Sequence, residues 1–202
     1  VADAGAATLD RTAILVGGFT ADLAATAAVQ VRNPRRGWEP VGCALLTPRA
    51  DATVIALDEE RLLVIGGWTG VLPDEVTRLG SIEICEPAQP HRRRTTPSPF
   101  ETAEEGLDGH AATVLPDGRV VLLHRNRLAV FDPDSERWSP PTTLDTTCLH
   151  ASVASAGPDQ LVVIGGELGE GDAVVRSIHL EPDGGRRMNW SETSIPAVRD
   201  AA

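Results

Sequence analysis

The sequence predicts an all-β fold built from four copies of one structural unit, and two observations lead to this prediction. First, an apolar run that ends in two adjacent glycines occurs as AILVGG, LLVIGG and LVVIGG, whose last residues are Gly18, Gly67 and Gly166. These glycines are 49 and 99 positions apart, so a fourth copy is expected in the longer gap. Second, short β-branched runs alternate with turn clusters, and no window shows a sustained helical period.

The fourth copy is the segment GHAATVLPDGRVVLLHR, in which His124 and Arg125 stand where the glycine pair is expected. Tryptophans follow the same step, because Trp38, Trp138 and Trp190 are 100 and 52 positions apart. A period near 50 residues is typical of repeat proteins, whose unit cannot bury its own apolar face alone. The single domain of 202 residues is therefore expected to contain repeats at about 1–45, 46–100, 105–145 and 146–199.

Each repeat predicts the same strands in the same order. Small and apolar residues, as in Ala52 to Leu57, form the first strand, and a turn such as LPDGR or AGPDQ leads to the β-branched second strand. A third strand ends at proline in VQVRNP, IEICEP, LAVFDP and IHLEP, since proline cannot donate to the ladder. The segment containing tryptophan supplies the fourth strand, and in the second repeat, which lacks this tryptophan, His91 and RRR stand near its place. Each unit is thus expected to be a small antiparallel sheet of up to four strands.

The glycine pairs are interpreted as structural. A phosphate-binding loop would need a helix after the glycines, and no helical pattern follows any of the pairs. We expect glycine there because a strand end with positive φ and close packing excludes other residues. The structural set is Gly17, Gly18, Gly66, Gly67, Gly165 and Gly166. Trp38, Trp138 and Trp190 are expected to fill the space between neighbouring units.

The glycine pair, the FDPDSERW turn and the tryptophan that closes it resemble the kelch motif, in four copies that cover nearly the whole chain. The resemblance implies four-stranded blades of a β-propeller. Kelch propellers usually have more than four blades, so the chain is expected to be part of a six- or seven-bladed ring, with a closed four-bladed ring as the alternative. Because both chain ends read like the inside of a first strand, adjoining blades are expected to be missing from this chain.

Composition narrows the function classes. The formal net charge of −11 argues against nucleic acid or an anionic membrane surface as the main partner. The chain contains no lysine, which excludes Schiff-base chemistry, and no tyrosine, which excludes the copper radical mechanism of oxidases resembling galactose oxidase. No apolar segment is long enough for a membrane span. Three dispersed cysteines, Cys43, Cys85 and Cys148, are expected to be buried free thiols. The use of arginine with abundant alanine suggests a bacterial source.

One set of polar residues is predicted at the start of the first strands. Alignment of the units by their glycines places Asp3, Asp51, His110 and His150 at one equivalent position. The resemblance to kelch propellers implies that this strand lies closest to the central channel, where the four side chains would form a polar ring. Imidazole and carboxylate groups are ligands for divalent metals, but local hydrogen bonding is the simpler role, so no metal is assigned.

A second set of candidates lies where loops are expected to reach one propeller face. Arg49 and Arg199 match the arginine that opens many kelch repeats, which implies either a ligand contact or a salt bridge at the edge of the repeat. Phe19 and Trp68 directly follow glycine pairs, where an aromatic side chain could anchor a partner or pack on the next loop. The segment 91–100, HRRRTTPSPF, is expected to be a mobile loop or a binding loop for an acidic partner.

The sequence therefore favours a kelch-repeat binding module that binds a protein or ligand through the loops of one propeller face. A glycan or a carboxylate-bearing ligand would suit the arginine candidates. The alternative is the propeller portion of a carbohydrate-active or lyase-like enzyme, with Asp51, His110 and His150 lining the funnel. Binding is preferred because no Ser/His/Asp order and no GxSxG motif is present. We assign no catalytic residue and no cofactor.

Overall fold

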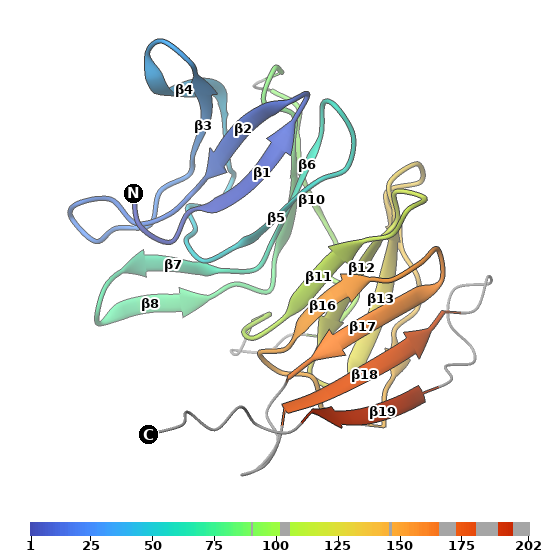
Figure 1. Ribbon diagram of the computed structural model, residues 1–202. Coiled ribbons are helices and arrows are strands. Elements are labelled where there is room, and N and C mark those ends of the chain that lie inside the picture. The colour runs from blue at the N-terminus through green and yellow to red at the C-terminus, as the bar shows by residue number, and fades with distance from the viewer. Residues whose placement is uncertain (90, 102–105, 146, 166–172, 181–189, 196–202) are drawn as a thin grey trace, which may run out of the picture. The chain divides into compact units, whose positions relative to one another are not determined.

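The structure, a computed structural model, describes residues 1–202 except 90, 102–105, 146, 166–172, 181–189 and 196–202. All regular elements among the described residues are β-strands, and so this part of the chain offers no helix long and apolar enough to cross a membrane. The chain divides into two compact units, Val1–Asp108 and Gly109–Ala202 (Figure 1). Each unit contains two of the antiparallel sheets that the repeats predicted, which confirms the all-β fold.

The first unit begins with a sheet whose strands are paired in chain order. They are β1 (Gly5–Leu9), β2 (Thr12–Val16), β3 (Ala28–Asn33) and β4 (Gly37–Ala44). Asp10 and Arg11 connect β1 to β2, and both have positive φ, 42° and 62°. A two-residue turn of this kind matches the twist of the strands that it joins. On β2, Ile14 and Val16 are buried and their neighbours less so, because side chains alternate between the two faces of a strand.

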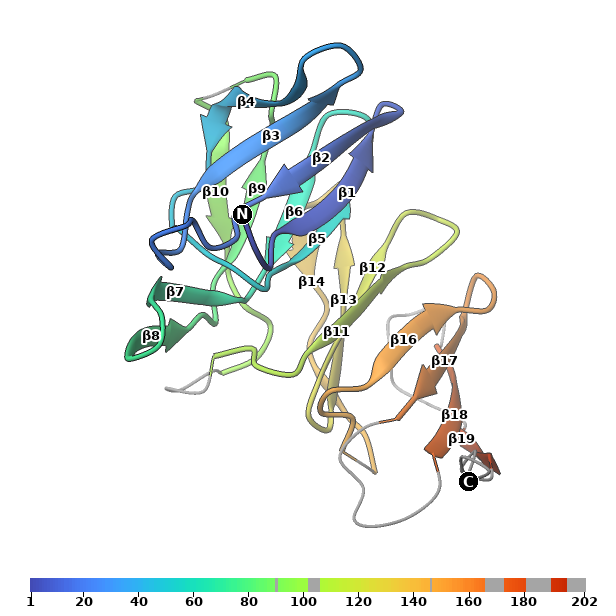
Figure 2. The same cartoon turned by 60° about the vertical axis from the view of Figure 1, so that its left-hand side comes forward.

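The second sheet of this unit has the order β10-β9-β6-β5. Its strands are β5 (Thr53–Ala56), β6 (Leu62–Ile65), β9 (Ile82–Cys85) and β10 (Arg93–Thr96). Every residue of β6 and β9 is buried, as expected for strands that are covered on both faces. Between them the chain forms a separate hairpin of β7 (Trp68–Val71) and β8 (Glu75–Arg78), which stands apart from the sheet (Figure 2).

The second unit repeats this plan. Its first sheet contains β11 (Ala111–Val114), β12 (Val120–His124), β13 (Arg127–Asp132) and β14 (Arg137–Trp138), and β15 (Thr142–Thr143) also pairs with β13. Its second sheet contains β16 (Ser152–Ser155), β17 (Gln160–Ile164), β18 (Ala173–His179) and β19 (Trp190–Ile195). Within the first unit β1 lies beside β5, and within the second β11 lies beside β16. The first strands of successive sheets are therefore neighbours, as the innermost strands of adjacent propeller blades are.

The core of each unit is aliphatic and lies between its two sheets. In the first unit, β2 and β3 of one sheet contribute Val16 and Val29, and β6 of the other contributes Leu62 and Val64. In the second unit, Leu123, Leu128, Leu161 and Val163 belong to one buried cluster. Residues from both sheets of a unit thus share one apolar cluster, as expected for repeats that bury their apolar faces against a neighbour.

The predicted structural role of the glycine pairs is supported by their backbone. Five of the six glycines have positive φ, namely Gly17, Gly18, Gly66, Gly67 and Gly165, and Gly166 lies outside the described residues. A Cβ added to Gly67 would lie 2.4 Å from the carbonyl oxygen of Ala50, so both conformation and space demand glycine. In the third repeat the glycine pair is replaced by a two-residue turn between His124 and Arg127, in which Arg125 adopts a φ of 56° and no long loop follows.

The tryptophans correct one prediction. Trp38 does not fill the space between units, because its side chain is 41% exposed on the outer strand β4. Strand alternation explains this, since Cys43 and the other inward positions of β4 are odd-numbered. Trp138 is partly buried and its ring packs on Phe131, with 5.0 Å between ring centroids. Trp190 begins β19, and its side chain lies outside the described part.

Candidate functional site

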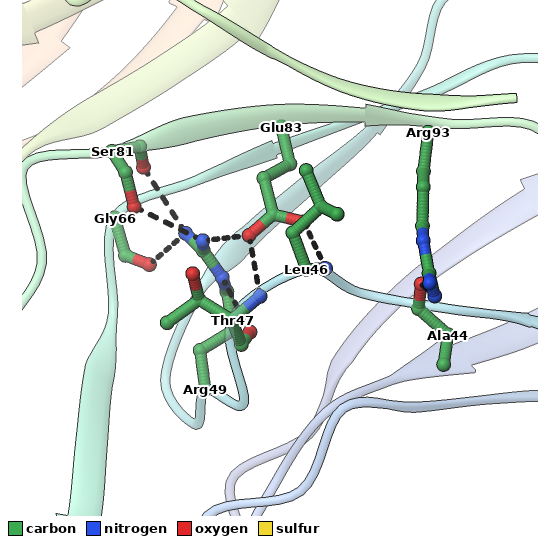
Figure 3. A network of polar contacts seen from close by, with 8 residues as sticks. All are labelled: Ala44, Leu46, Thr47, Arg49, Gly66, Ser81, Glu83 and Arg93. Atoms are coloured by element: carbon green, nitrogen blue, oxygen red, sulfur yellow. Dashed lines mark hydrogen bonds and ion pairs between the residues drawn. The ribbon is translucent and has the colours of Figure 1, made fainter.

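Arg49 is completely buried, contrary to the prediction that it reaches the ligand face. Its Nη1 donates to the carbonyl oxygens of Gly66 at 2.9 Å and Ser81 at 3.0 Å. Its Nη2 donates to Ser81 Oγ at 3.1 Å and forms an ion pair with the carboxylate of Glu83 (Figure 3). Burial lowers the pKa of the guanidinium, and the charge of Glu83 opposes this effect. The ion pair with Glu83 lies within the second repeat (46–100) and joins the edge where that repeat begins to its third strand.

Glu83 completes this network from the third strand of the second sheet. Its two carboxylate oxygens accept hydrogen bonds from the backbone N–H groups of Leu46, at 2.6 Å, and Thr47, at 3.0 Å. The segment that leaves the first sheet is therefore fixed to the second sheet by a buried charge and its hydrogen bonds (Figure 3). The donors and acceptors of this network bond one another, so the network supports the fold and leaves no hydrogen-bonding group for a ligand.

The predicted ring of Asp3, Asp51, His110 and His150 needs a correction of one residue. Asp3, Asp51 and His150 have nearly the same φ, 53°, 53° and 55°. The backbone N–H of Asp51 donates to the backbone carbonyl oxygen of Asp3 at 2.7 Å, and the backbone N–H of His150 donates to the backbone carbonyl oxygen of Gly109 at 2.8 Å. Gly109, whose φ is 66°, therefore holds the equivalent position and His110 follows it.

The reason is the first hairpin. Asp3 lies 14 residues before Gly17, whereas Asp51 lies 15 before Gly66, because the turn at residues 10–11 is one residue shorter. His110 lies 14 residues before His124, as Asp3 does before Gly17, so alignment by the glycine positions placed it one residue too late in the third repeat. The candidates divide between the two units, with Asp51 in the first and both histidines in the second. Within the described ranges, no three His, Cys, Asp or Glu side chains are placed to hold a metal ion.

The loops that follow the glycine pairs of the first unit form one hydrogen-bonded surface, which we call the loop face. It consists of residues 1–3, residues 19–25 and the β7–β8 hairpin. The backbone N–H of Ala25 donates to the oxygen of Gly70 at 2.8 Å, and that of Leu72 donates to the oxygen of Leu23 at 3.0 Å. Phe19 forms a β-bridge with Ala2 on one side, and these segments lie together near the N-terminus in Figures 1 and 2.

Trp68 begins the hairpin of the loop face, as its position after Gly67 predicted. It exchanges backbone hydrogen bonds of 2.8 Å with Ala50. The guanidinium of Arg78 lies over its ring, 4.7 Å from the centroid, and Arg78 Nε also pairs with Asp108 Oδ2 at 3.0 Å. One side of the ring is therefore covered by its own hairpin, which limits its use as an anchor for a partner.

The loop face contains an open pocket of about 500 Å³. Its walls include Asp3, Phe19, Thr20, Leu23 and Leu72. Leu23 is unusual, because its side chain is 49% exposed and its backbone has a φ of 60°. A bulky residue seldom adopts this conformation, which favours glycine or asparagine. The sequence placed Phe19 on a loop of this face, where its side chain is buried at the pocket wall, but it did not single out Leu23 and Leu72, since no local pattern distinguishes a loop leucine that lines a pocket.

The basic segment 91–100 differs from the predicted mobile loop. Its residues Arg93 to Thr96 form strand β10, paired in register with β9. Arg94 forms an ion pair with Glu86 at 3.2 Å, and Arg92 lies 3.8 Å from the same carboxylate. The charge of this segment is therefore partly neutralised within the blade. Arg199 lies outside the described residues, so its predicted role stays a prediction.

Comparison with known proteins supports the fold. No protein-family model matches the sequence, and no curated protein matches it. Among solved structures 130 chains match, and one of them is the structure of YjhT, a bacterial kelch-repeat propeller protein. That match has a TM-score of 0.68 and 16% sequence identity, and it covers 98% of this chain and 66% of YjhT. The chain thus has a kelch-propeller fold and spans less than two thirds of the matched protein. A fold shared so widely does not specify a function.

Proposed function

We propose that this chain is a binding module that accepts an apolar group of a protein or ligand in the pocket of the loop face. Its kelch-type fold presents the loops that follow the second strands together, and the pocket lies among them. Ligand sites are typically concave, mostly apolar and equipped with a few polar groups. Here the carboxylate of Asp3 and the hydroxyl of Thr20 supply the polar groups among the lining residues.

The observation that carries this proposal is Leu23. An exposed leucine with a φ of 60° contributes nothing to a buried core and costs conformational energy. Strained backbone of this kind persists where the surroundings hold it, often at ligand sites. Two backbone contacts hold this loop, because Thr20 accepts a hydrogen bond from the N–H of Leu23 and donates its own N–H to Ala24. The loop thereby presents an apolar side chain to solvent at the edge of the pocket.

The charge of the loop face bears on the kind of partner. The predicted carboxylate-bearing ligand depended on Arg49, which is buried and paired with Glu83. Arg78, the basic residue of the β7–β8 hairpin, pairs with Asp108. Asp3 and Asp22 are exposed on the same face. A neutral or basic partner therefore suits the described part of this face better than an anionic one.

The enzymatic alternative receives no comparable support. A carbohydrate-active or lyase-like site would need its acid and base side chains to meet around one substrate. Of the residues proposed for it, His110 does not hold the position of Asp51 and His150, because Gly109 occupies that position in the third repeat. We infer that these residues serve the backbone geometry at the start of the inner strands.

The chain spans 66% of YjhT, which supports the prediction that further blades adjoin these four in the complete propeller. A six- or seven-bladed ring remains our proposal, with a closed four-bladed ring as the alternative. Light scattering together with thermal unfolding of the chain tests it. A monomer with one sharp transition would favour the closed ring, whereas association of chains would favour the larger one.

The Leu23→Asn variant tests the binding proposal. Asparagine accepts positive φ, so the variant should unfold at the same temperature as the wild type or slightly above it. Peptides selected from a displayed library against the wild type should bind the variant about tenfold more weakly, since about 1.4 kcal/mol of apolar contact is lost. Val114→Asn is the matched control, because Val114 is also exposed (38%) but lies in the second unit.

A glycan array probed with the same proteins decides between ligand classes. Binding to sugars that is lost in Leu23→Asn would assign the pocket to a glycan, and binding restricted to peptides would assign it to a protein partner. The proposal fails if selected ligands bind both the wild type and Leu23→Asn equally, or if Val114→Asn weakens them as much.

A further inference from the structure

Two of the three cysteines lie together in the core of the first unit. Cys43 is on β4 of the first sheet and Cys85 is on β9 of the second, and each is 1% exposed. Both belong to the same apolar cluster, and both are free thiols. Cys148 is also a buried free thiol, but it belongs to the core of the second unit. The proposed binding function uses none of these side chains.

The side chain of Arg93 links the surroundings of the two thiols. Arg93 on β10 lies directly opposite Cys85 in the strand register. Its Nη1 reaches across to the first sheet and donates to the carbonyl oxygen of Ala44 at 3.0 Å (Figure 3). Ala44 follows Cys43, whose Sγ is 3.8 Å from the same oxygen. The hydrogen bond from Arg93 to Ala44 thus joins the two sheets beside both cysteines, which lie in the same apolar cluster.

The two thiols differ in their electrostatic surroundings. A hydrogen bond with Cys85 lowers the pKa of Cys43, and the charge of Arg93 and the backbone N–H of Glu86 add to this effect against burial. The same contact and burial raise the pKa of Cys85. A thiolate is the reactive form of cysteine, and the guanidinium of Arg93 is bonded to the carbonyl oxygen of Ala44 that Cys43 Sγ also approaches, so we take Cys43 as the nucleophile and Cys85 as its protonated partner.

We propose that Cys43 and Cys85 are an oxidisable pair that a peroxide converts into a disulfide joining the first two sheets. The Cys43 thiolate attacks one oxygen of hydrogen peroxide, so that an S–O bond forms, the O–O bond breaks and hydroxide leaves. The sulfur of Cys85 then attacks the resulting sulfenic acid, an S–S bond forms and the S–O bond breaks. The hydroxide released in this second step takes the proton of Cys85, and the hydroxide released in the first step takes the proton that Cys43 lost when it ionised. Both sulfurs are oxidised, and the peroxide is reduced to two waters.

This bond would change stability because it crosses between sheets. The two cysteines are 42 positions apart, so the disulfide closes a long loop and restricts the unfolded chain. The midpoint of thermal unfolding should rise by about 5 °C or more on oxidation and return on reduction. Because both thiols are buried, the reaction should need local opening of the outer strands and should be slow compared with that of an exposed thiol.

The experiment treats the full chain with hydrogen peroxide, digests it without reduction and identifies the peptides by mass spectrometry. The expected product is one peptide pair joined through Cys43 and Cys85, lighter by two hydrogen atoms, while Cys148 stays reduced. Burial raises the pKa of Cys148, which makes it the internal control. The Cys148→Ser variant should keep both the cross-link and the thermal shift.

A second variant identifies the nucleophile. In Cys85→Ser the sulfenic acid on Cys43 has no resolving thiol, so dimedone should label Cys43. The proposal is overturned if Cys148 oxidises as fast as the pair, if disulfides form only between chains, or if Cys43 advances to sulfinic acid without cross-linking in the wild type. If Cys85→Ser does not fold, the digest of the peroxide-treated wild type still shows whether Cys43 and Cys85 are cross-linked.

Discussion

Removal of the Glu83 carboxylate should destabilise the first unit more than any single surface change. In Glu83→Ala the guanidinium of Arg49 keeps its complete burial but loses its counter-charge. The N–H groups of Leu46 and Thr47 lose their acceptors as well. Breaking a buried ion pair from one side typically costs about 3–5 kcal/mol, and we expect about 4 kcal/mol here. For a chain of this length that loss corresponds to roughly 8–16 °C in Tm.

The third repeat shows which apolar residues can replace the buried ion pair in a double variant. At the positions that correspond to Arg49 and Glu83, the third repeat has Leu107 and Ala129, and both are buried. The double variant Arg49→Leu/Glu83→Ala copies this apolar solution. It should lose less stability than the sum of the two single variants, by about 2 kcal/mol, because no buried charge is left unpaired.

Urea unfolding of the four proteins of this cycle, followed by circular dichroism, measures these losses. Arg36→Met is the control, because Arg36 and Glu39 form an ion pair at 3.6 Å on the surface, and its loss should stay below about 0.5 kcal/mol. The reasoning is refuted if each single variant at the buried pair loses less than about 1 kcal/mol, or if the losses of the two single variants simply add.

Two further predictions concern turns. Gly67→Ala should lower the free energy of unfolding by about 3 kcal/mol or more, since its Cβ would meet the carbonyl oxygen of Ala50 at 2.4 Å. Gly118→Ala, at a similar φ of 88° but in open space, should lower it by about 1 kcal/mol. Equal losses of stability in thermal unfolding would contradict the steric argument. A hydrogen bond from Ser135 lowers the pKa of Asp132, so this carboxylate stabilises the fold above the unfolded pKa of about 3.9, and its contribution disappears as the pH falls through the folded pKa. Asp132→Ala should therefore be less stable than the wild type at pH 7 and nearly equal to it in strong acid, and an unchanged difference in urea unfolding at both pH values would disprove the assignment.

The strands were predictable from sequence because their determinants are local. The alternation in Thr12–Val16, the turn residues and the glycines with positive φ act within a few positions, and these predict the sheets. The burial of Arg49 was not predictable, since its partner Glu83 is 34 residues away and the pattern IEICEP does not distinguish a paired acid from a solvated one. Trp38 was misplaced because the repeat predicts its position along the strand but not the face on which it falls.

In the candidate site, too, features set by local sequence could be predicted and features set by the folded structure could not. Phe19 could be predicted from its place after the glycine pair, whereas Leu23 has no distinctive neighbour in the sequence, and its positive φ follows from hydrogen bonds that the folded loop makes. His110 shows how a one-residue difference in a hairpin defeats alignment by spacing, because only the ladder reveals that Gly109 occupies the position of Asp51.

The loop face is held together by main-chain groups, and this has an evolutionary consequence. The hydrogen bonds that join residues 19–25 to the β7–β8 hairpin, such as Ala25 N–H to Gly70 O, need no particular side chain at Leu23 or Val71. Selection can therefore exchange the exposed residues of these loops without dismantling the scaffold that presents them. A protein built in this way can acquire a new partner through a few substitutions, so related chains with the same blades are expected to diverge first and furthest at this face.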